Sequence, residues 1–245
     1  MIAGGALLGA IIGSFVATLV IRWPQGRSVV SGHSHCDVCD QRLGARDLIP
    51  LFSFAIQKGR CRYCNTPINA RHIYVELGCA AIGGIALALS PDLAGLAGAG
   101  FGWTLLALAV LDAEHFWLPD WLVLPLGIAG LAIGAAGIGI GLSDRVIGAL
   151  AGFVSLEAIR ITYRLTRGRE GLGGGDPKLL GAIGAWLGWQ VLPFVVLGAS
   201  GIGLLWVVSK MLRGRVVSAS DRIPLGTLLA VGAFAVWVFT MIRLA

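Results

Sequence analysis

Eight apolar stretches recur along the chain, and they limit its fold more than any other feature. They cover residues 1–21, 73–90, 93–111, 121–141, 146–163, 179–190, 192–209 and 224–243. A run of about 20 apolar residues can cross the roughly 30 Å hydrocarbon core of a bilayer as one helix. The stretches therefore predict an all-α polytopic membrane protein with about eight transmembrane helices. Because the run at 179–190 is short, the main alternative is seven spans with one re-entrant or long segment.

The stretch between the first two apolar runs is the one sizeable polar part of the sequence. We predict a first transmembrane helix at residues 1–21, a polar loop at 22–72 and a transmembrane bundle at 73–245. The composition agrees, since 56% of the 245 residues are hydrophobic and 13% are charged. The mean hydropathy of +0.83 lies outside the range of an ordinary soluble domain. The chain is therefore expected to reside in the lipid bilayer.

The basic residues predict the orientation of the chain in the membrane. In the eight-span arrangement, all 19 Lys and Arg residues except Arg145 and Arg243 fall on one side, in the polar loop and in segments 160–178 and 210–222. Lys and Arg accumulate in cytoplasmic loops, so the polar loop is expected in the cytoplasm and both termini outside. The same clustering beside apolar runs argues against nucleic-acid binding, which a pI near 9.4 would otherwise suggest.

Four of the five cysteines form two C-x-x-C pairs in the polar loop. They are Cys36 with Cys39 and Cys61 with Cys64. Two such turns can present four thiolates to one tetrahedral ion, and Zn²⁺ is the default metal for this set. Because a polar loop of this size buries little core, metal binding could supply its folding free energy. Redox dithiols and a metal-free loop are the alternatives, and Cys79, inside an apolar run, is expected to be a small core residue.

Two aspartates at the edges of apolar runs are the leading catalytic candidates. Asp112 ends the third run, and Asp176 follows Gly173-Gly174-Gly175 and precedes Pro177. Carboxylates in or beside membrane spans are costly and are functional-site candidates by default. The predicted orientation puts both on the cytoplasmic side. If they meet, they would share one proton and leave an acid and a base around a water molecule, which is the apparatus of an aspartic protease.

Other acidic residues leave alternatives open. Glu114 and Asp120 compete for the role of the first aspartate, although Asp120 looks like a helix-start residue. Either candidate aspartate could instead cap a helix or pair with Arg169 or Lys178. Glu76, in the first turn of the second run, could pair with an arginine of the polar loop or help to form a second site.

The chain resembles the bacterial type IV prepilin leader peptidases, also called prepilin peptidase/N-methyltransferases, of the GxGD class of membrane aspartic proteases. The resemblance covers nearly the whole length, and its motifs occur in a specific order and spacing. They are Gly13-Ser14-Phe15, Arg22-Trp23-Pro24, the two C-x-x-C pairs, Ile68-Asn69-Ala70-Arg71-His72 leading to Val75-Glu76, Leu111-Asp112 to Leu118-Pro119-Asp120, Gly173 to Lys178 and Ile223-Pro224-Leu225-Gly226.

This resemblance implies a function. Asp112 and Asp176 match the two catalytic aspartates of the family. The substrates would be prepilins or pseudopilins of type IV pili or type II secretion, cut at the cytoplasmic edge of the bacterial inner membrane between a short basic leader and an apolar helix. Members with the cysteine loop also methylate the new N-terminus with S-adenosylmethionine. The chain departs from the family pattern at Ala17, where Asn is usual, and at Leu225-Gly226-Thr227, where Phe-Gly-Pro is usual. Both departures are expected to affect methylation and to leave cleavage untouched.

Two functions of other classes remain as alternatives. A transporter or channel could use membrane carboxylates to conduct ions or protons, but it would give no role to a polar four-cysteine loop. A zinc-stabilised scaffold for pilus or secretion assembly would need no chemistry at the aspartates. An intramembrane protease with the same aspartate pair and other substrates is a closer alternative, which only substrate tests separate.

Overall fold

The computed structural model describes residues 1–29, 33–36, 38–214 and 223–244. Within this part of the chain, the secondary structure consists of helices and two isolated β-bridges. Arg215 and Arg222, which the orientation argument counted, lie outside the described residues. The chain divides into two compact units, Met1–Ala107 and Leu108–Ala245. Helix α4 (Leu93–His115) begins in the first unit and ends in the second.

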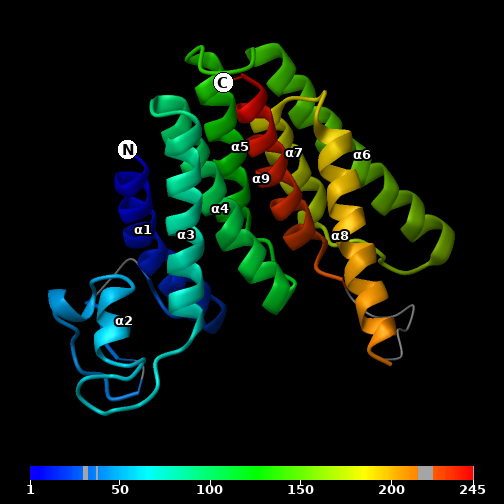
Figure 1. The fold of residues 1–245 in the computed structure, drawn as a ribbon. Helices are drawn as coiled ribbons and strands as arrows, with labels where there is room; N and C mark the ends of the chain where they lie inside the picture. Colours follow the sequence, from blue (N-terminus) through cyan, green and yellow to red (C-terminus); the bar gives the residue numbers. More distant parts are fainter. Residues whose placement is uncertain (30–32, 37, 215–222, 245) are drawn as a thin grey trace. The chain divides into compact units, whose positions relative to one another are not determined.

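The first unit is built around the packing of α1 (Ile2–Arg22) against α3 (Arg71–Leu89) (Figure 1). Glycines on α1 let the two backbones approach closely, because a Cβ placed on Gly13 would lie 2.7 Å from the Cα of Glu76. Cys79 on α3 is fully buried, as predicted for a small core residue. Between the two helices, the polar loop holds η1 (Trp23–Gln25), η2 (Ala45–Asp47) and α2 (Phe52–Ile56).

Among its described residues, the second unit contains the end of α4 and five further helices. These are α5 (Asp120–Ala135), α6 (Leu142–Arg167), α7 (Gly175–Leu187), α8 (Leu192–Leu212) and α9 (Leu225–Leu244). Helix α7 contacts the other four (Figure 1), and its residues from Asp176 to Trp186 are buried except for the half-buried Lys178. By contrast, α6 and α8 expose leucines such as Leu150 and Leu205, as helices facing lipid do.

Each of the eight predicted apolar stretches corresponds to a helix. Six of these helices, α1, α3, α4, α6, α8 and α9, are long and apolar enough to cross a membrane. Helices α5 and α7 have 16 and 13 residues, which at about 1.5 Å per residue is shorter than the hydrocarbon core. The prediction of an all-α multi-pass membrane protein is confirmed. The count of eight spans remains a prediction.

Arg145, one of two basic residues on the predicted outer side, has a structural role. Its side chain is 4% exposed and donates to four backbone carbonyls. The acceptors are Ile140 at 3.1 Å, Gly130 at 2.9 Å, Ala185 at 3.2 Å and Ile138 at 3.0 Å. Gly130 lies in α5, Ile138 and Ile140 lie in the connection between α5 and α6, and Ala185 lies in the last turn of α7, where helices carry unsatisfied acceptors. The guanidinium therefore joins α5, α6 and α7.

Candidate active site and cysteine cluster

Asp112 lies one turn before the end of α4 and contacts the start of α9. Its side chain is 5% exposed. The backbone N–H of Thr227 donates to Oδ2 at 2.7 Å, the hydroxyl of Thr227 lies 3.2 Å from the same oxygen, and Gly226 adds a backbone hydrogen bond. First-turn N–H groups have no partner within their own helix. Asp112 therefore satisfies a first-turn N–H of α9 from another helix.

Asp176 lies in the first turn of α7, directly after the glycine run. Its side chain is 6% exposed, and the Gly173 backbone hydrogen bonds to its carboxyl group. A Cβ on Gly173 would lie 2.9 Å from Oδ2 of Asp176. That position therefore leaves room for the carboxyl group only because it lacks a side chain.

Within the second unit the charge of Asp112 acts on Asp176, although 63 residues separate them in the sequence. The side chain of Leu118 contacts the glycines beside both. A Cβ on Gly175 would lie 2.7 Å from Cβ of Leu118, and one on Gly226 would lie 2.8 Å from its Cδ1. Two buried carboxyl groups whose charges repel each other ionise together at a cost, and sharing one proton would avoid that cost. That state supplies one acid and one base.

The competing acidic residues have different surroundings. Both carboxyl oxygens of Asp120 accept from Lys178 Nζ, at 2.8 and 2.9 Å, in an exposed ion pair. Asp120 is the first residue of α5, as predicted for a helix-start residue. Glu114 is exposed, with His115 Nε2 at 3.8 Å. Burial therefore distinguishes Asp112 and Asp176 from these residues, and Lys178 pairs with Asp120.

The two C-x-x-C segments form turns of the same geometry. In each, the residue after the second cysteine donates its N–H to the carbonyl of the first cysteine, Asp40 to Cys36 at 3.0 Å and Asn65 to Cys61 at 2.9 Å. Asp40 and Asn65 have φ values of 56° and 58°, in the left-handed region that Asp and Asn tolerate better than most residues. The repeated turn directs both cysteine pairs to a common point.

The four thiol groups fit a tetrahedral metal site. The Sγ atoms of Cys36, Cys39, Cys61 and Cys64 all lie within 4.8 Å of one another, and those of Cys36 and Cys64 are 3.9 Å apart. Zinc–sulfur bonds of about 2.3 Å in a tetrahedron require sulfur atoms roughly 3.8 Å apart. The donor set therefore fits zinc.

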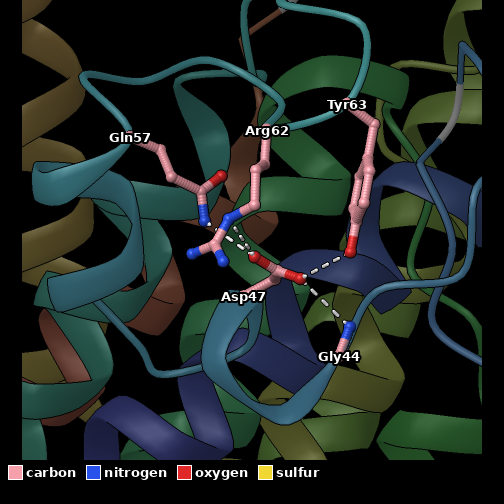
Figure 2. Close-up of polar contacts among 5 residues, drawn as sticks. All are labelled: Gly44, Asp47, Gln57, Arg62 and Tyr63. Atoms are coloured by element: carbon pink, nitrogen blue, oxygen red, sulfur yellow. Dashed lines mark hydrogen bonds and ion pairs between the residues drawn. The ribbon is translucent and has the colours of Figure 1, made fainter.

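Asp47, which sequence reasoning did not select, joins several residues of the polar loop through its carboxyl group (Figure 2). Its side chain is 5% exposed. One oxygen accepts from Gln57 Nε2 at 3.1 Å and lies 3.1 Å from Arg62 Nε, and the other accepts from the Gly44 N–H at 3.1 Å and from the Tyr63 hydroxyl at 3.5 Å. An aspartate in a charged loop looks like a solvated residue, so nothing in the sequence signalled this network.

The first unit also contains a cavity of about 360 Å³, lined by residues of α1, α3 and the polar loop. Glu76 lines it and is 6% exposed. Its Oε2 accepts from the Leu51 N–H at 2.8 Å, and Ser14 is a second hydrogen-bond partner. This is the intramembrane carboxylate that the sequence left without an assigned partner, and all residues that line its cavity belong to the first unit.

Comparison with known proteins assigns a family to each half of the chain. Residues 7–89 match the bacterial peptidase A24 N-terminal domain, and residues 99–208, which hold both aspartates, match the type IV leader peptidase family. The chain is 37% identical to a prepilin leader peptidase/N-methyltransferase of Burkholderia pseudomallei (strain K96243), over 97% of this chain and 85% of the relative.

Further relatives carry the same description. The protein of Burkholderia pseudomallei (strain 1026b) is 42% identical over 84% of this chain and 67% of its own length, and that of Aeromonas hydrophila is 41% identical over 82% and 69%. No solved structure gives a significant match. The resemblance inferred from the motifs is confirmed, and the chain belongs to the prepilin leader peptidase/N-methyltransferase family.

Proposed function

We propose that this protein is a membrane aspartic endopeptidase that removes the basic leader of type IV prepilins or pseudopilins and then methylates the new N-terminus. The observation that carries the proposal is the pair of buried carboxyl groups, Asp112 and Asp176, in electrostatic contact at the ends of α4 and α7. Family membership supports the substrate class, because the relatives are described as prepilin leader peptidases and N-methyltransferases.

Cleavage follows from one shared proton on the pair. The ionised aspartate removes a proton from a water molecule as the water oxygen attacks the scissile carbonyl carbon. The protonated aspartate donates a hydrogen bond to the carbonyl oxygen, where negative charge develops. When the carbon–nitrogen bond breaks, the leaving amine takes the proton that the aspartate removed from water and becomes the new N-terminus of the pilin, and the pair regains its single proton. Either Asp112 or Asp176 can fill each role, since each lies beside a glycine that leaves space at its carboxyl group.

The charge distribution supports a cytoplasmic active site in the bacterial inner membrane. Basic residues cluster in the polar loop and in segments 160–178 and 210–222, so positive-inside sorting puts these parts in the cytoplasm and both termini in the periplasm. Asp176 lies within one of these basic segments. A basic leader stays on the cytoplasmic side for the same reason, so the scissile bond next to an apolar helix would lie at this membrane edge.

The cysteine cluster belongs to the proposal as a structural site. Cys36, Cys39, Cys61 and Cys64 would hold one Zn²⁺ per chain, and the bound metal would fix the polar loop, which has few apolar residues for a core. The methylation step needs a methyl donor, for which we propose S-adenosylmethionine. It supplies a methyl group on a positively charged sulfur.

The deciding experiment is cleavage of a prepilin substrate in liposomes by the wild type and by Asp112→Asn and Asp176→Asn. Asparagine keeps a hydrogen-bond acceptor for α9 but does not act as an acid or base, so both variants should fold and lose cleavage. Asp120→Asn and Glu114→Gln are matched controls that should keep it. Mass spectrometry of the product detects the added methyl group.

The possible results separate the proposed enzyme from its rivals. Cleavage by the wild type and the controls, with none by the two Asp→Asn variants, supports the aspartic peptidase. Equal cleavage by all five proteins would overturn the catalytic assignment of Asp112 and Asp176. If the wild type cleaves no prepilin or pseudopilin, the transporter and the scaffold become the leading hypotheses. Ion flux across the same liposomes would then favour the transporter over the scaffold.

A further inference from the structure

The cavity in the first unit has the size and the lining of a small-molecule site. Its volume of about 360 Å³ falls within the range of ligand pockets, roughly 300–1,000 Å³. All of its lining residues lie between Ser14 and Glu76, whereas both candidate peptidase aspartates belong to the second unit. Hydrolysis by the aspartate pair therefore leaves the cavity without a role.

Several family motifs that the peptidase mechanism does not use meet at this cavity. Ser14 comes from the first motif and Arg22 from the second, while Asn69, His72 and Glu76 come from the segment at the start of α3. These residues are spread over more than sixty positions of the sequence. Their convergence on one cavity indicates a binding function for the first unit.

The cavity has polar and apolar lining that matches a nucleoside joined to an amino acid. Leu43, Leu48, Phe54 and Ile68 supply apolar surface of the kind on which a purine ring packs. Asn69 supplies a side-chain amide for the polar atoms of the ligand. This combination of apolar walls and a few polar groups is typical of cofactor sites.

Glu76 gives the cavity a buried carboxyl group. It is 6% exposed, and the Leu51 N–H and Ser14 hold it in position. A sulfonium sulfur carries a permanent positive charge, which a carboxylate in a cavity of low dielectric attracts strongly. The carboxyl group of Glu76 therefore suits a sulfonium cofactor. Binding such a cofactor would explain why a carboxylate is buried in this membrane protein.

The cysteine cluster forms part of the same cavity wall. Cys36 and Cys61, one from each turn, are both lining residues. A metal ion held by the four thiol groups would therefore fix the shape of the cavity. This gives the cysteine loop a role in ligand binding in addition to its own folding.

From these observations, we infer that the cavity between α1, α3 and the polar loop is the binding site for S-adenosylmethionine, with Glu76 facing its sulfonium group. The inference rests on the proposed methylation activity. It adds the location of the cofactor and the residue that distinguishes the charged donor from the neutral product, S-adenosylhomocysteine.

The test is equilibrium binding of radiolabelled S-adenosylmethionine to the full-length protein in nanodiscs, with prepilin cleavage measured on the same samples. Thr18→Phe adds an aromatic ring to the cavity. It removes the hydrogen bond that the Thr18 hydroxyl donates to the Ser14 carbonyl within α1. It should weaken binding at least about tenfold and leave cleavage within about twofold. Thr166→Phe is the matched control, because Thr166 also bonds within its own helix, on exposed α6 surface.

Glu76→Gln tests the charge, since glutamine keeps an acceptor for Leu51. It should weaken binding of S-adenosylmethionine about tenfold or more and change binding of S-adenosylhomocysteine much less. The control Glu170→Gln removes an exposed carboxylate and should change neither. Ultraviolet cross-linking of the bound cofactor, followed by peptide mapping, should label peptides within residues 14–76.

Each result has a defined meaning. Unchanged binding in Thr18→Phe, or label confined to peptides after Leu108, would overturn the site. Equal weakening of both ligands by Glu76→Gln would overturn the role of its charge. A wild type that cleaves prepilin but neither binds nor transfers the methyl group would refute the methylation half of the proposed function, and loss of cleavage in every sample would refute the peptidase half.

Discussion

Replacing Thr227 tests how Asp112 is held for catalysis. Thr227 is the third residue of α9, and its N–H donates to Asp112 Oδ2 at 2.7 Å. Thr227→Pro removes this N–H. Proline removes no intrahelical hydrogen bond there, because first-turn N–H groups have none. Proline is tolerated in the first turn of a helix, so the helix should form and the protein should remain folded. Relatives with the usual proline lack this N–H, so the predicted loss applies to this chain, in which Asp112 accepts from Thr227.

The expected loss of rate follows from the strength of this bond. A hydrogen bond to a charged group contributes about 1.5–3 kcal/mol. If the contact positions Asp112 in the transition state, its loss should lower kcat about tenfold to hundredfold, at about 1.4 kcal/mol per factor of ten. KM should change little, because Thr227 acts through Asp112 and does not bind substrate.

The Thr227 hydroxyl group should matter less than the N–H. It has one proton to donate and lies 2.8 Å from the Ala109 carbonyl but 3.2 Å from Asp112 Oδ2. The proton therefore goes mainly to Ala109, and Thr227→Val should lower kcat less than about fivefold while costing about 1 kcal/mol of stability. Thr227→Ser keeps both groups and should stay within about twofold of the wild type.

Steady-state cleavage of a prepilin peptide in detergent, with kcat and KM determined separately for the three variants, is the assay. Thermal melting of each preparation shows whether a loss of rate reflects unfolding. An unchanged kcat in Thr227→Pro, or a larger loss in Thr227→Val than in Thr227→Pro, would refute the reasoning that the backbone N–H positions Asp112.

Three further predictions concern other parts of the molecule. Gly226→Ala would place a Cβ 3.0 Å from Oδ2 of Asp112, so the rate of cleavage should fall at least about tenfold. In the control Gly198→Ala the added Cβ meets no neighbouring atom, so the rate should not change. Arg145→Met removes four hydrogen bonds to backbone carbonyls, and its melting temperature should fall by about 6 °C or more. Metal analysis should find one zinc per chain in the wild type and in Cys79→Ser, and none in Cys61→Ser.

The sequence predicted the features that depend on local pattern. The apolar runs located the helices because a backbone in lipid has no water to bond with. A run that crosses the bilayer therefore forms a helix, in which its N–H and C=O groups pair with one another. Helix ends were less accurate. The run predicted at 121–141 ends as helix α5 at Ala135, and the run predicted at 146–163 extends from Leu142 to Arg167 as α6. The repeated C-x-x-C spacing predicted a cluster of four thiol groups, which the structure contains.

The tertiary contacts of the site could not be predicted in the same way. Thr227 was noted only as a departure from the family pattern, with an expected effect on methylation. The structure also places its backbone N–H against Asp112, 115 positions earlier in the chain. Such a contact has no periodicity or spacing that a single sequence displays. The same holds for Leu118, whose side chain looks like one more apolar residue and yet lies against the glycines beside both aspartates.

The distribution of polar groups between the two units separates the two proposed chemistries. The second unit contains the two aspartates, with glycines that leave room around their carboxyl groups. The first contains Glu76, its cavity and the four cysteines. A peptidase needs an acid and a base on one water molecule, whereas transfer of a methyl group to an amine needs a bound donor and a route for one proton. With separate sites, the aspartate pair can hold the single proton that hydrolysis needs while Glu76 stays charged for the methyl donor. Neither carboxyl group has to serve both reactions.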